Sequence, residues 1–575
     1  MKHLQLYFSF FAVLSVVLAV EANRGINGGY YCFGCTMAVG VLQQIAEVHN
    51  ASISESLESV CKYLPELSSR GTHMRRECQT LIRLLGPVLI ELFYTHETPD
   101  VICHALRFCY TETGERECRL FPLPKGGIPG RLEKLRPILR KHLVKLNIPE
   151  FLEPCSWPGL KRICELADSV LDHNPAVDLD GDGFSSVEAL RGSAWRGRDC
   201  SDVQKNIRPG VIPDSDKDLD ANCNGIYGVD ANGVPYEETL CPKNLTSRGI
   251  VVIGDSAMAH FHIPEQWVDA ELFTWESFSH LPYVLENEFD WPMMSSTTGF
   301  VNITWPISPG PVHSIYLQMK ERNRCVHRDY QNLAVNGADS FDTQYNQKRL
   351  SRDPVNDYPL LVLFALVGND VCNSYPDTLS HMTTPEEMRN NVLKSLEYLN
   401  STIPADSKVL LVGLADGRVL YDSMYQRFHP IGRHNQDITY PQFYDYFGCL
   451  QATPCQGWMT SNATLRDLTF ERADKLNQVL FDVAKTYKNK FTNLEVNFLE
   501  CPLMTVLEDW ERVHGPGSIH QLVEAVDGFH PNQKAQSLIA QYSWKYLGKY
   551  LPHYLGDLNP HNHQIRDIFG DQGGH

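Results

Sequence analysis

The chain has 575 residues, 17 cysteines and a formal net charge of −18, and 43% of its residues are hydrophobic. This length indicates more than one domain. The negative charge argues against a nucleic-acid partner, because a phosphate-binding protein normally needs a strongly positive face.

The N-terminus predicts a secretory signal peptide at residues 1–22. Lys2 and His3 precede a mostly apolar run at 4–20, and Ala22 offers a small-residue cleavage site. No later segment is apolar enough to predict a membrane span. We therefore expect a protein that is secreted or held in endolysosomal or cytoplasmic vesicles, with oxidised cysteines. Glycosylation sequons consistent with this route stand at Asn50, Asn244, Asn302, Asn400 and Asn462.

Cysteine spacing predicts a small disulfide-linked helical domain at residues 28–119. Apolar residues recur there at helical spacing, as at Met37, Val41, Ile45 and Val48. Six cysteines allow 15 pairings, so the spacing alone leaves the connectivity open. A secreted helical module without a lipid role is one interpretation, since such a bundle is stable for its own sake. The pattern also resembles the saposin family of lipid-binding domains, which implies the pairs Cys32–Cys109, Cys35–Cys103 and Cys61–Cys78.

Residues 120–154 are expected to form a linker that contains a processing site. Prolines and glycines between residues 121 and 130 predict that no regular element forms there. The basic stretch at 131–145 has leucines at helical spacing, but Pro137 argues against a continuous helix. This stretch fits either a contact with an anionic surface or a solvated helix face.

Residues 155–240 contain two acidic loops, at 178–184 and 220–226, of the kind that bind calcium. Each loop alternates oxygen-bearing side chains and then has a glycine for a sharp turn, followed by a residue whose carbonyl faces the ion. Neither loop is a complete EF-hand, because Ala189 and Ala231 occupy the twelfth positions. A solvated acidic loop is the alternative. We expect structural Ca²⁺ bound by Asp178, Asp180, Asp182, Phe184, Asp199, Asp202, Asp216, Asp220, Asn222, Asn224 and Ile226.

Residues 241–575 have the alternating pattern of strands and helices that is typical of an α/β domain. Buried strands are predicted at 249–253, 359–367, 408–414 and 494–499. Thr384 and Glu387 form a capping box that opens a helix, with Pro385 in its first turn. We therefore expect a sheet with helices on both faces.

Three short strings that lie far apart in this domain contain the groups that ester hydrolysis needs. They are Gly-Asp-Ser at 254–256, Gly-Asn-Asp at 368–370 and Asp-Gly-Phe-His at 527–530. Ser256 follows the first predicted strand and is expected at the carboxyl edge of the sheet, where open α/β sheets have their active sites. Ser256 would attack the carbonyl, His530 would accept its proton, and Asp527 would orient the imidazole. The expected oxyanion donors are the backbone N–H groups of Ser256 and Gly337 and the side chain of Asn369.

With residues 332–338, these strings resemble in order the four motif blocks of the SGNH (GDSL) hydrolase family. The resemblance implies a flavodoxin-like α/β fold. His260 and His262 are then expected to be packing or substrate-side residues, because the base of this family lies in the last block. Arg322, Arg324, His327 and Arg328 form a basic group, which fits either lipid phosphates or a solvated surface.

The order of the modules resembles the acyloxyacyl hydrolase family across essentially the whole chain, including the strings at 196–200, 327–332 and 569–575. The resemblance implies hydrolysis of the secondary fatty acyl chains of lipid A, the lipid part of bacterial lipopolysaccharide, at a membrane or micelle, and activity on other acyl lipids. It also implies a precursor cut into a small and a large disulfide-linked subunit, although 145–154 has no obvious basic cleavage site. The alternatives are a broad phospholipase or lysophospholipase of the same fold and a saposin-type lipid-binding protein with an inactive hydrolase domain.

The remaining cysteines complete the disulfide scheme. The family's subunit link requires that Cys118 pair with the catalytic domain, for which we choose Cys449. Cys501 is then expected to be the free thiol. The other expected pairs are Cys155–Cys164, Cys200–Cys223, Cys241–Cys325 and Cys372–Cys455.

Overall fold

The structure, a computed structural model, describes residues 25–50, 86–146, 172–188, 190–274, 283–284, 287–301 and 310–575. Some features expected from the sequence lie outside the described residues, namely the signal peptide at 1–22, the pairs Cys61–Cys78 and Cys155–Cys164, the sequon at Asn302, and Ala189. Of the other sequon residues, Asn400 is partly exposed and Asn50, Asn244 and Asn462 are exposed.

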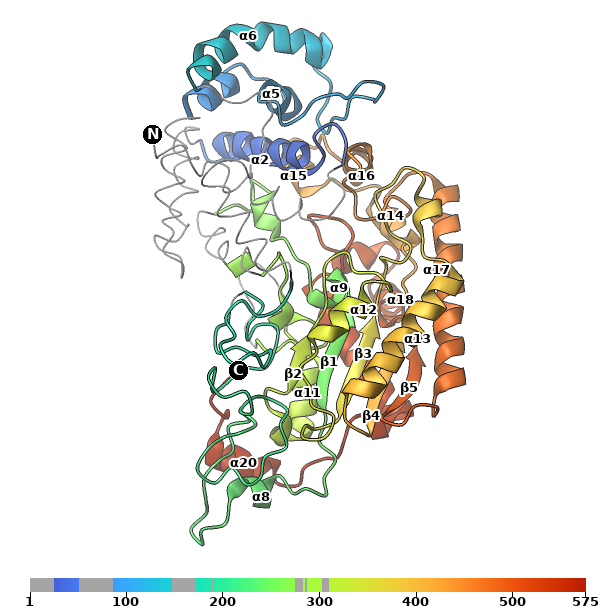
Figure 1. Cartoon of the computed structure of the whole chain (residues 1–575). Coiled ribbons are helices and arrows are strands. Elements are labelled where there is room, and N and C mark those ends of the chain that lie inside the picture. The colour runs from blue at the N-terminus through green and yellow to red at the C-terminus, as the bar shows by residue number, and fades with distance from the viewer. Residues whose placement is uncertain are drawn as a thin grey trace.

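A five-stranded parallel sheet forms the centre of the catalytic domain (Figure 1), with the strand order β2-β1-β3-β4-β5. The strands are β1 (Gly249–Gly254), β2 (Tyr330–Asn332), β3 (Leu360–Ala365), β4 (Ser407–Val412) and β5 (Leu494–Leu499). Every residue of β1, β3 and β4 is buried, because both faces of these strands are covered, and their sequences are almost entirely apolar. The four predicted strands are therefore confirmed. The sequence analysis did not predict β2, which is short and partly polar.

Helices cover both faces of this sheet, as predicted. On one face, Val251 and Ile253 of β1 share a core with α13 (Pro385–Thr402) and α17 (Ala463–Tyr487). On the other face, Ile250 and Val252 share a core with α11 (Ile315–Arg322) and α19 (Gln533–Tyr550). The capping box of Thr384 and Glu387 is present at the start of α13. The other α-helices that the structure describes in this domain are α9 (Ser256–Ala259), α12 (Thr343–Asn346), α14 (Arg418–Met424), α15 (Pro430–Arg433), α16 (Tyr440–Cys449), α18 (Pro502–His514) and α20 (Asn562–Phe569).

The N-terminal part of the chain forms a helical domain above the carboxyl edge of the sheet (Figure 1). Its helices within the described residues are α2 (Gly29–Val48), α5 (Pro99–Ala105) and α6 (Gly127–Leu146). The disulfides Cys32–Cys109 and Cys35–Cys103 join α2 to α5 and to the chain that follows it. Both pairs are those that the saposin resemblance implied.

Helix α6 corrects the expectation that residues 120–154 are a linker. Pro129 lies in the first turn of the helix, where its missing N–H is not needed, and Pro137 is accommodated inside. The helix packs against α5, and Leu135 is buried in the shared core. Arg131 Nε donates to Glu97 Oε2 at 2.7 Å. The helical domain therefore extends well past residue 119.

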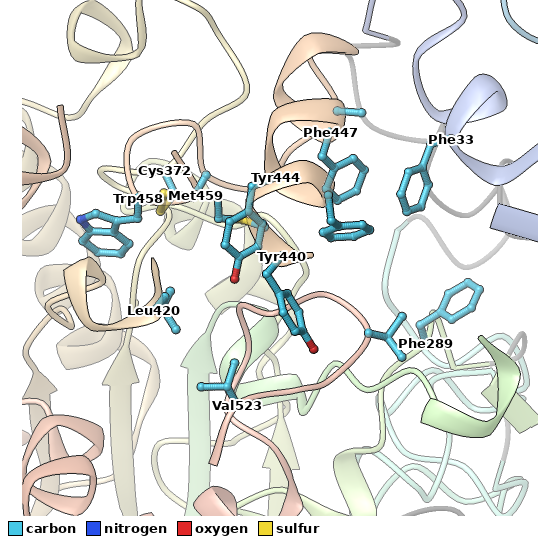
Figure 2. Close-up of a cluster of buried hydrophobic side chains, with 14 of the residues drawn as sticks. Phe33, Phe289, Cys372, Leu420, Tyr440, Tyr444, Phe447, Trp458, Met459 and Val523 are labelled. Atoms are coloured by element: carbon cyan, nitrogen blue, oxygen red, sulfur yellow. A yellow bond between two sulfur atoms is a disulfide. The ribbon is translucent and has the colours of Figure 1, made fainter. Parts of the chain in front are cut away.

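An aromatic cluster joins α2 to α16 of the catalytic domain. The rings of Phe33 and Phe447 stack with centroids 4.3 Å apart, and Phe443 meets Phe33 edge-on at 6.0 Å (Figure 2). An aromatic pair contributes about 0.5–1.5 kcal/mol beyond the area that it buries. This contact fixes the helical domain on one end of the hydrolase.

Polar and covalent contacts reinforce the same interface. Tyr446 Oη donates to Thr36 Oγ1 at 3.0 Å, and Gln44 Nε2 donates to the carbonyl of Ile431 at 2.6 Å. The interface also contains the disulfide Cys118–Cys449, which is the pairing chosen from the sequence.

The acidic segment at 172–240 has little regular structure apart from α8 (Tyr236–Leu240) and lies beside α20 near the C-terminus (Figure 1). The disulfide Cys200–Cys223 joins the second acidic loop to the chain between the two loops, and Cys241–Cys325 ties the end of the segment to the catalytic domain. Cys372–Cys455 is also formed, whereas Cys501 is buried and free within the part of the chain that the structure describes. None of the described helices is both long and apolar enough to cross a membrane.

Candidate active site

The turn after β1 holds Ser256 at the carboxyl edge of the sheet. Asp255 caps α9, with Oδ1 accepting from the N–H of Ala257 at 3.0 Å. Its Oδ2 accepts from the N–H groups of Val367 at 2.7 Å and Gly368 at 3.2 Å. Burial raises the pKa of Asp255, and these three donors act in the opposite direction. The Asp of the Gly-Asp-Ser string thus ties the turn that carries Ser256 to the chain after β3.

Ser256, His530 and Asp527 form a hydrogen-bonded chain. His530 Nε2 lies 2.8 Å from Ser256 Oγ, and His530 Nδ1 lies 2.6 Å from Asp527 Oδ2. The carboxylate accepts from Nδ1–H, which leaves Nε2 free to accept the serine proton. Burial by itself would lower the pKa of His530, but the charge and hydrogen bond of Asp527 raise it above its usual value. This geometry is that of an activated serine nucleophile with its base and orienting acid.

The loop that carries Asp527 and His530 is held by hydrogen bonds from α16 and from the residue that precedes α15. Tyr444 Oη donates to the carbonyl of Gly528 at 2.7 Å, and Tyr440 Oη donates to the carbonyl of Ala525 at 2.5 Å. Gly528 has a φ of 64° and leaves no room for a Cβ beside these tyrosines. His429 accepts from the N–H of Ile431 through Nδ1, so its Nε2–H donates to the carbonyl of Val526 at 2.8 Å.

The expected oxyanion donors are only partly brought together. Asn369 lines the same cavity as Ser256 and His530. Its Nδ2 donates to the carbonyl of Ala338 at 3.2 Å, which places it beside the turn that contains Gly337. Gly337 itself has a φ of 79°, is exposed, and is outside the set of described residues that line this cavity. The structure therefore places Asn369 for an oxyanion more directly than Gly337.

The cavity beside Ser256 has a volume of about 50 Å³ and mostly apolar walls. Its apolar lining includes Val419, Leu420, Trp458, Leu503, Met504, Leu507 and Phe529. Gly417 is required in its wall, since a Cβ there would overlap the ring of Trp458. Such walls accept the hydrocarbon part of an ester rather than a charged group.

His260 and His262 are buried beside the catalytic histidine. Burial lowers the pKa of His260 well below its usual value, and neither ring nitrogen has a hydrogen-bond partner among the described residues. His262 Nδ1 lies 2.8 Å from Glu524 Oε2. Glu524 could not be singled out from the sequence, because a glutamate three residues before Asp527 belongs to none of the motif blocks.

The basic group at 322–328 is engaged within the protein. Arg324 donates to the carbonyl of Gly570 at 3.0 Å and to Gln572 Oε1 at 2.9 Å. Arg328 donates to the carbonyls of Gly573 and Gly574. Arg324 and Arg328 thus hold the C-terminal tail, which argues against both a lipid-phosphate site and a solvated surface at these two residues.

The first acidic loop presents carboxylate oxygens that lack hydrogen-bond partners. One ligand oxygen from each of Asp178, Asp180 and Asp182 lies within 4.8 Å of the others. The buried oxygens without a partner among the described residues include Oδ2 of Asp180, Asp182, Asp199 and Asp216. Burial raises the pKa of Asp182 and of Asp216 to about 6 and that of Asp199 to about 7. Asp202 accepts from Ser186 instead. Orphaned, buried carboxylate oxygens of this kind fit a hard cation.

The second loop repeats the backbone hydrogen bonding of the first, in which Gly183 N donates to Asp178 Oδ2 and Phe184 N donates to Asp182 Oδ1. Asp220 Oδ2 accepts from the N–H of Gly225 at 2.8 Å, and Asn224 Oδ1 accepts from the N–H of Ile226 at 2.7 Å. Glu237, which the sequence analysis missed, accepts from Asn222 Nδ2 at 3.0 Å and from Asn224 Nδ2, and burial raises its pKa to about 8. Cys200 and Cys223 lie close to Asp199 but offer no thiolate, since they are joined in a disulfide.

Comparison with known proteins agrees with both halves of this architecture. A saposin-like domain model matches residues 31–165, and a GDSL-like lipase/acylhydrolase model matches residues 250–543. The acyloxyacyl hydrolase of Oryctolagus cuniculus is 44% identical over 550 residues, 95% of this chain and 94% of the relative. The acyloxyacyl hydrolases of Homo sapiens and Mus musculus are 42% and 43% identical and cover 96% and 98% of this chain and 95% and 97% of their own length.

The chain belongs to the acyloxyacyl hydrolase family. As a member of this family with a GDSL-type lipase domain, the protein is a carboxylic ester hydrolase. The saposin-like match runs past residue 146, in agreement with the placement of α6 in the helical domain.

Replacing Ser256 by alanine is expected to abolish ester hydrolysis without unfolding the protein, since only the nucleophile is lost. The expected loss of kcat is on the order of 10⁶-fold for Ser256→Ala, as in other serine hydrolases. It is about 10⁴-fold for Asp527→Asn, which favours the wrong imidazole tautomer. Hydrolysis of a soluble ester and thermal melting would be measured together, with Ser401→Ala on the exposed end of α13 as a matched control. Substantial turnover by a folded Ser256→Ala protein would refute the triad.

Proposed function

We propose that this protein removes the secondary fatty acyl chains of lipid A, those esterified to its 3-hydroxyacyl chains. The observation that supports the proposal is the hydrogen-bonded triad of Ser256, His530 and Asp527 beside an apolar cavity. The chain combines this site with a docked saposin-like domain and belongs to the acyloxyacyl hydrolase family. The name of the relatives specifies an acyl group esterified to another acyl chain, which is the linkage of the secondary chains.

The reaction proceeds through an acyl-enzyme. Ser256 Oγ attacks the ester carbonyl as its proton passes to His530 Nε2, and Asp527 stabilises the imidazolium. The oxyanion faces the backbone N–H of Ser256 and the amide of Asn369. Collapse breaks the ester bond and His530 returns the proton to the departing 3-hydroxyl oxygen of the primary chain. Water then attacks the acyl-serine with His530 again as the base, and the free fatty acid leaves.

The apolar surroundings of Ser256 address the main energetic obstacle. Drawing an acyl chain out of a lipid aggregate into water costs about 0.8 kcal/mol per methylene. The walls of the cavity, including Leu420, Trp458 and Leu503, offer apolar contacts in place of water. The saposin-like domain brings the enzyme to the lipid surface, where Lys134, Arg136 and Arg140 on the exposed side of α6 approach anionic headgroups.

Mass spectrometry of purified lipid A before and after incubation tests the proposal. The expected product has lost the mass of its secondary acyl chains and has kept its primary 3-hydroxyacyl chains, and Ser256→Ala leaves lipid A intact. Release of glycerophospholipid fatty acids with lipid A untouched would support the phospholipase alternative. Binding of lipid without release of any acyl chain would support the lipid-binding alternative.

We further propose that the protein enters the secretory pathway and is cut between the helical and catalytic parts. Residues 1–22 support secretion, and the disulfides described above need an oxidising compartment. Cys118–Cys449 supports a two-subunit form, since it joins the helical domain to α16 and would hold the two parts after a cut between them.

The acidic loops are proposed to bind structural Ca²⁺. The ligands would come from the expected residues of the two loops, and Glu237 is added to the second. Bound Ca²⁺ would supply the positive charge that keeps these buried carboxylates ionised. The triad itself needs no metal, so the ions would act on stability.

Removal of Ca²⁺ is therefore expected to lower the melting temperature. At 100 times Kd, a ligand that binds only the folded state contributes about 2.7 kcal/mol to the free energy of unfolding. The melting temperature would be measured in the presence of EDTA and again after Ca²⁺ is restored. The same measurement would be made on Asp180→Asn, in which EDTA is expected to lower the melting temperature by less. An unchanged melting temperature, with no metal in the purified protein, would contradict the calcium proposal.

A further inference from the structure

A second buried carboxylate, that of Glu524, lies against the catalytic loop. Its backbone makes two hydrogen bonds within that loop, since Glu524 N donates to the carbonyl of His530 at 2.8 Å and Gly528 N donates to the carbonyl of Glu524 at 2.9 Å. Glu524 is only 4% exposed. A buried carboxylate is costly unless it is paired, so its retention beside a catalytic base needs an explanation.

The partner of Glu524 comes from the segment that follows the nucleophile. Glu524 Oε2 lies 2.8 Å from His262 Nδ1. In the same segment, Phe261 N donates to the carbonyl of Ser256 at 2.9 Å, and the ring of Phe261 lies 4.8 Å from that of His530. The pair of His262 and Glu524 therefore joins the nucleophile segment to the catalytic loop by a contact separate from the bond between Ser256 and His530.

The charged and titratable groups around His530 are unevenly distributed. Asp527, Asp255 and Glu524 all favour its protonated form, while buried His260 and His262 lie on the side of α9. His429 and Tyr440 face the loop from α15 and α16 through backbone carbonyls. Burial raises the pKa of Glu524, whereas the charge and hydrogen bond of His262 lower it.

We propose that Glu524 is a positioning residue for ester hydrolysis. His262 holds the Glu524 side chain, and the Glu524 carboxylate fixes the catalytic loop and stabilises the imidazolium of His530. The imidazolium forms in a buried site, where nearby negative charge lowers the free energy of the transition state. Asp527 supplies the direct contact and Glu524 a second negative charge. The inference rests on the triad chemistry of the proposed function and is independent of which lipid is the substrate.

Two variants separate the charge of Glu524 from its shape. Glu524→Gln keeps the size and the ability to bond with His262 but removes the charge. The pKa of His530 then falls, so the acidic limb of the pH–rate profile moves to lower pH, and the rate at the plateau falls about tenfold, equivalent to one pKa unit. Glu524→Asp keeps the charge but shortens the side chain, so its acidic limb remains near that of the unchanged protein.

The readout is the second-order rate constant for labelling of Ser256 by a small fluorophosphonate, measured across pH on the full-length protein. Labelling needs the activated serine but no lipid, so its outcome is separate from that of the lipid A experiment. The control is Asp329→Asn, which removes an equally buried carboxylate, paired with Arg352 at 2.8 Å, at the opposite end of β1. Thermal melting would be recorded for every variant.

A lower plateau and a shifted acidic limb in Glu524→Gln, both absent from Asp329→Asn, would support the positioning role. Three results would overturn it. The first is an unchanged pH–rate profile in Glu524→Gln. The second is an equal loss of labelling rate in Glu524→Gln and Glu524→Asp, with the acidic limb of the profile unshifted in both. The third is a loss of labelling rate that Asp329→Asn shares in proportion to its lower melting temperature.

Discussion

The hydrogen bond between Ser256 Oγ and His530 Nε2 joins two segments that lie 274 residues apart. It forms only because β1 pairs with β3 in the middle of the sheet and α19, which starts after the catalytic loop, packs on one face of that sheet. Asp255 reinforces the arrangement, since its carboxylate spans from the nucleophile turn to the chain after β3. A buried parallel sheet therefore places the serine, and the rest of the site is arranged around its carboxyl edge.

Helix α16 connects this chemistry to the saposin-like domain. Phe447 and Tyr446 contact α2 of the saposin-like domain, while Tyr440 and Tyr444 donate to backbone carbonyls of the catalytic loop. Figure 2 shows the labelled aromatic residues of this helix in one buried cluster with Phe33. The helical domain thus supports the element that holds the catalytic loop. For this reason it is more than a detachable lipid-binding module.

The sequence predicted those parts of the molecule that depend on local pattern. The strands of continuous apolar residues and the capping box at Thr384 were predicted correctly, because burial requires apolar residues and helix capping requires particular residue types at a fixed spacing. The triad was found because its residue types and order are specific to the chemistry. Helix α6 was misinterpreted, since Pro129 and Pro137 count against a helix locally although tertiary packing stabilises one. Glu524 was missed because its role depends on a contact with His262 across the fold.

The central claim is that a secondary acyl chain of lipid A passes through Ser256. Acid quenching of the protein during turnover of lipid A, followed by peptide mapping in a mass spectrometer, tests it directly. The peptide that contains Ser256 is expected to carry the mass of a secondary acyl chain, and the same peptide of Ser256→Ala is expected to carry none. An acyl group on another residue, or a primary 3-hydroxyacyl group on Ser256, would contradict it.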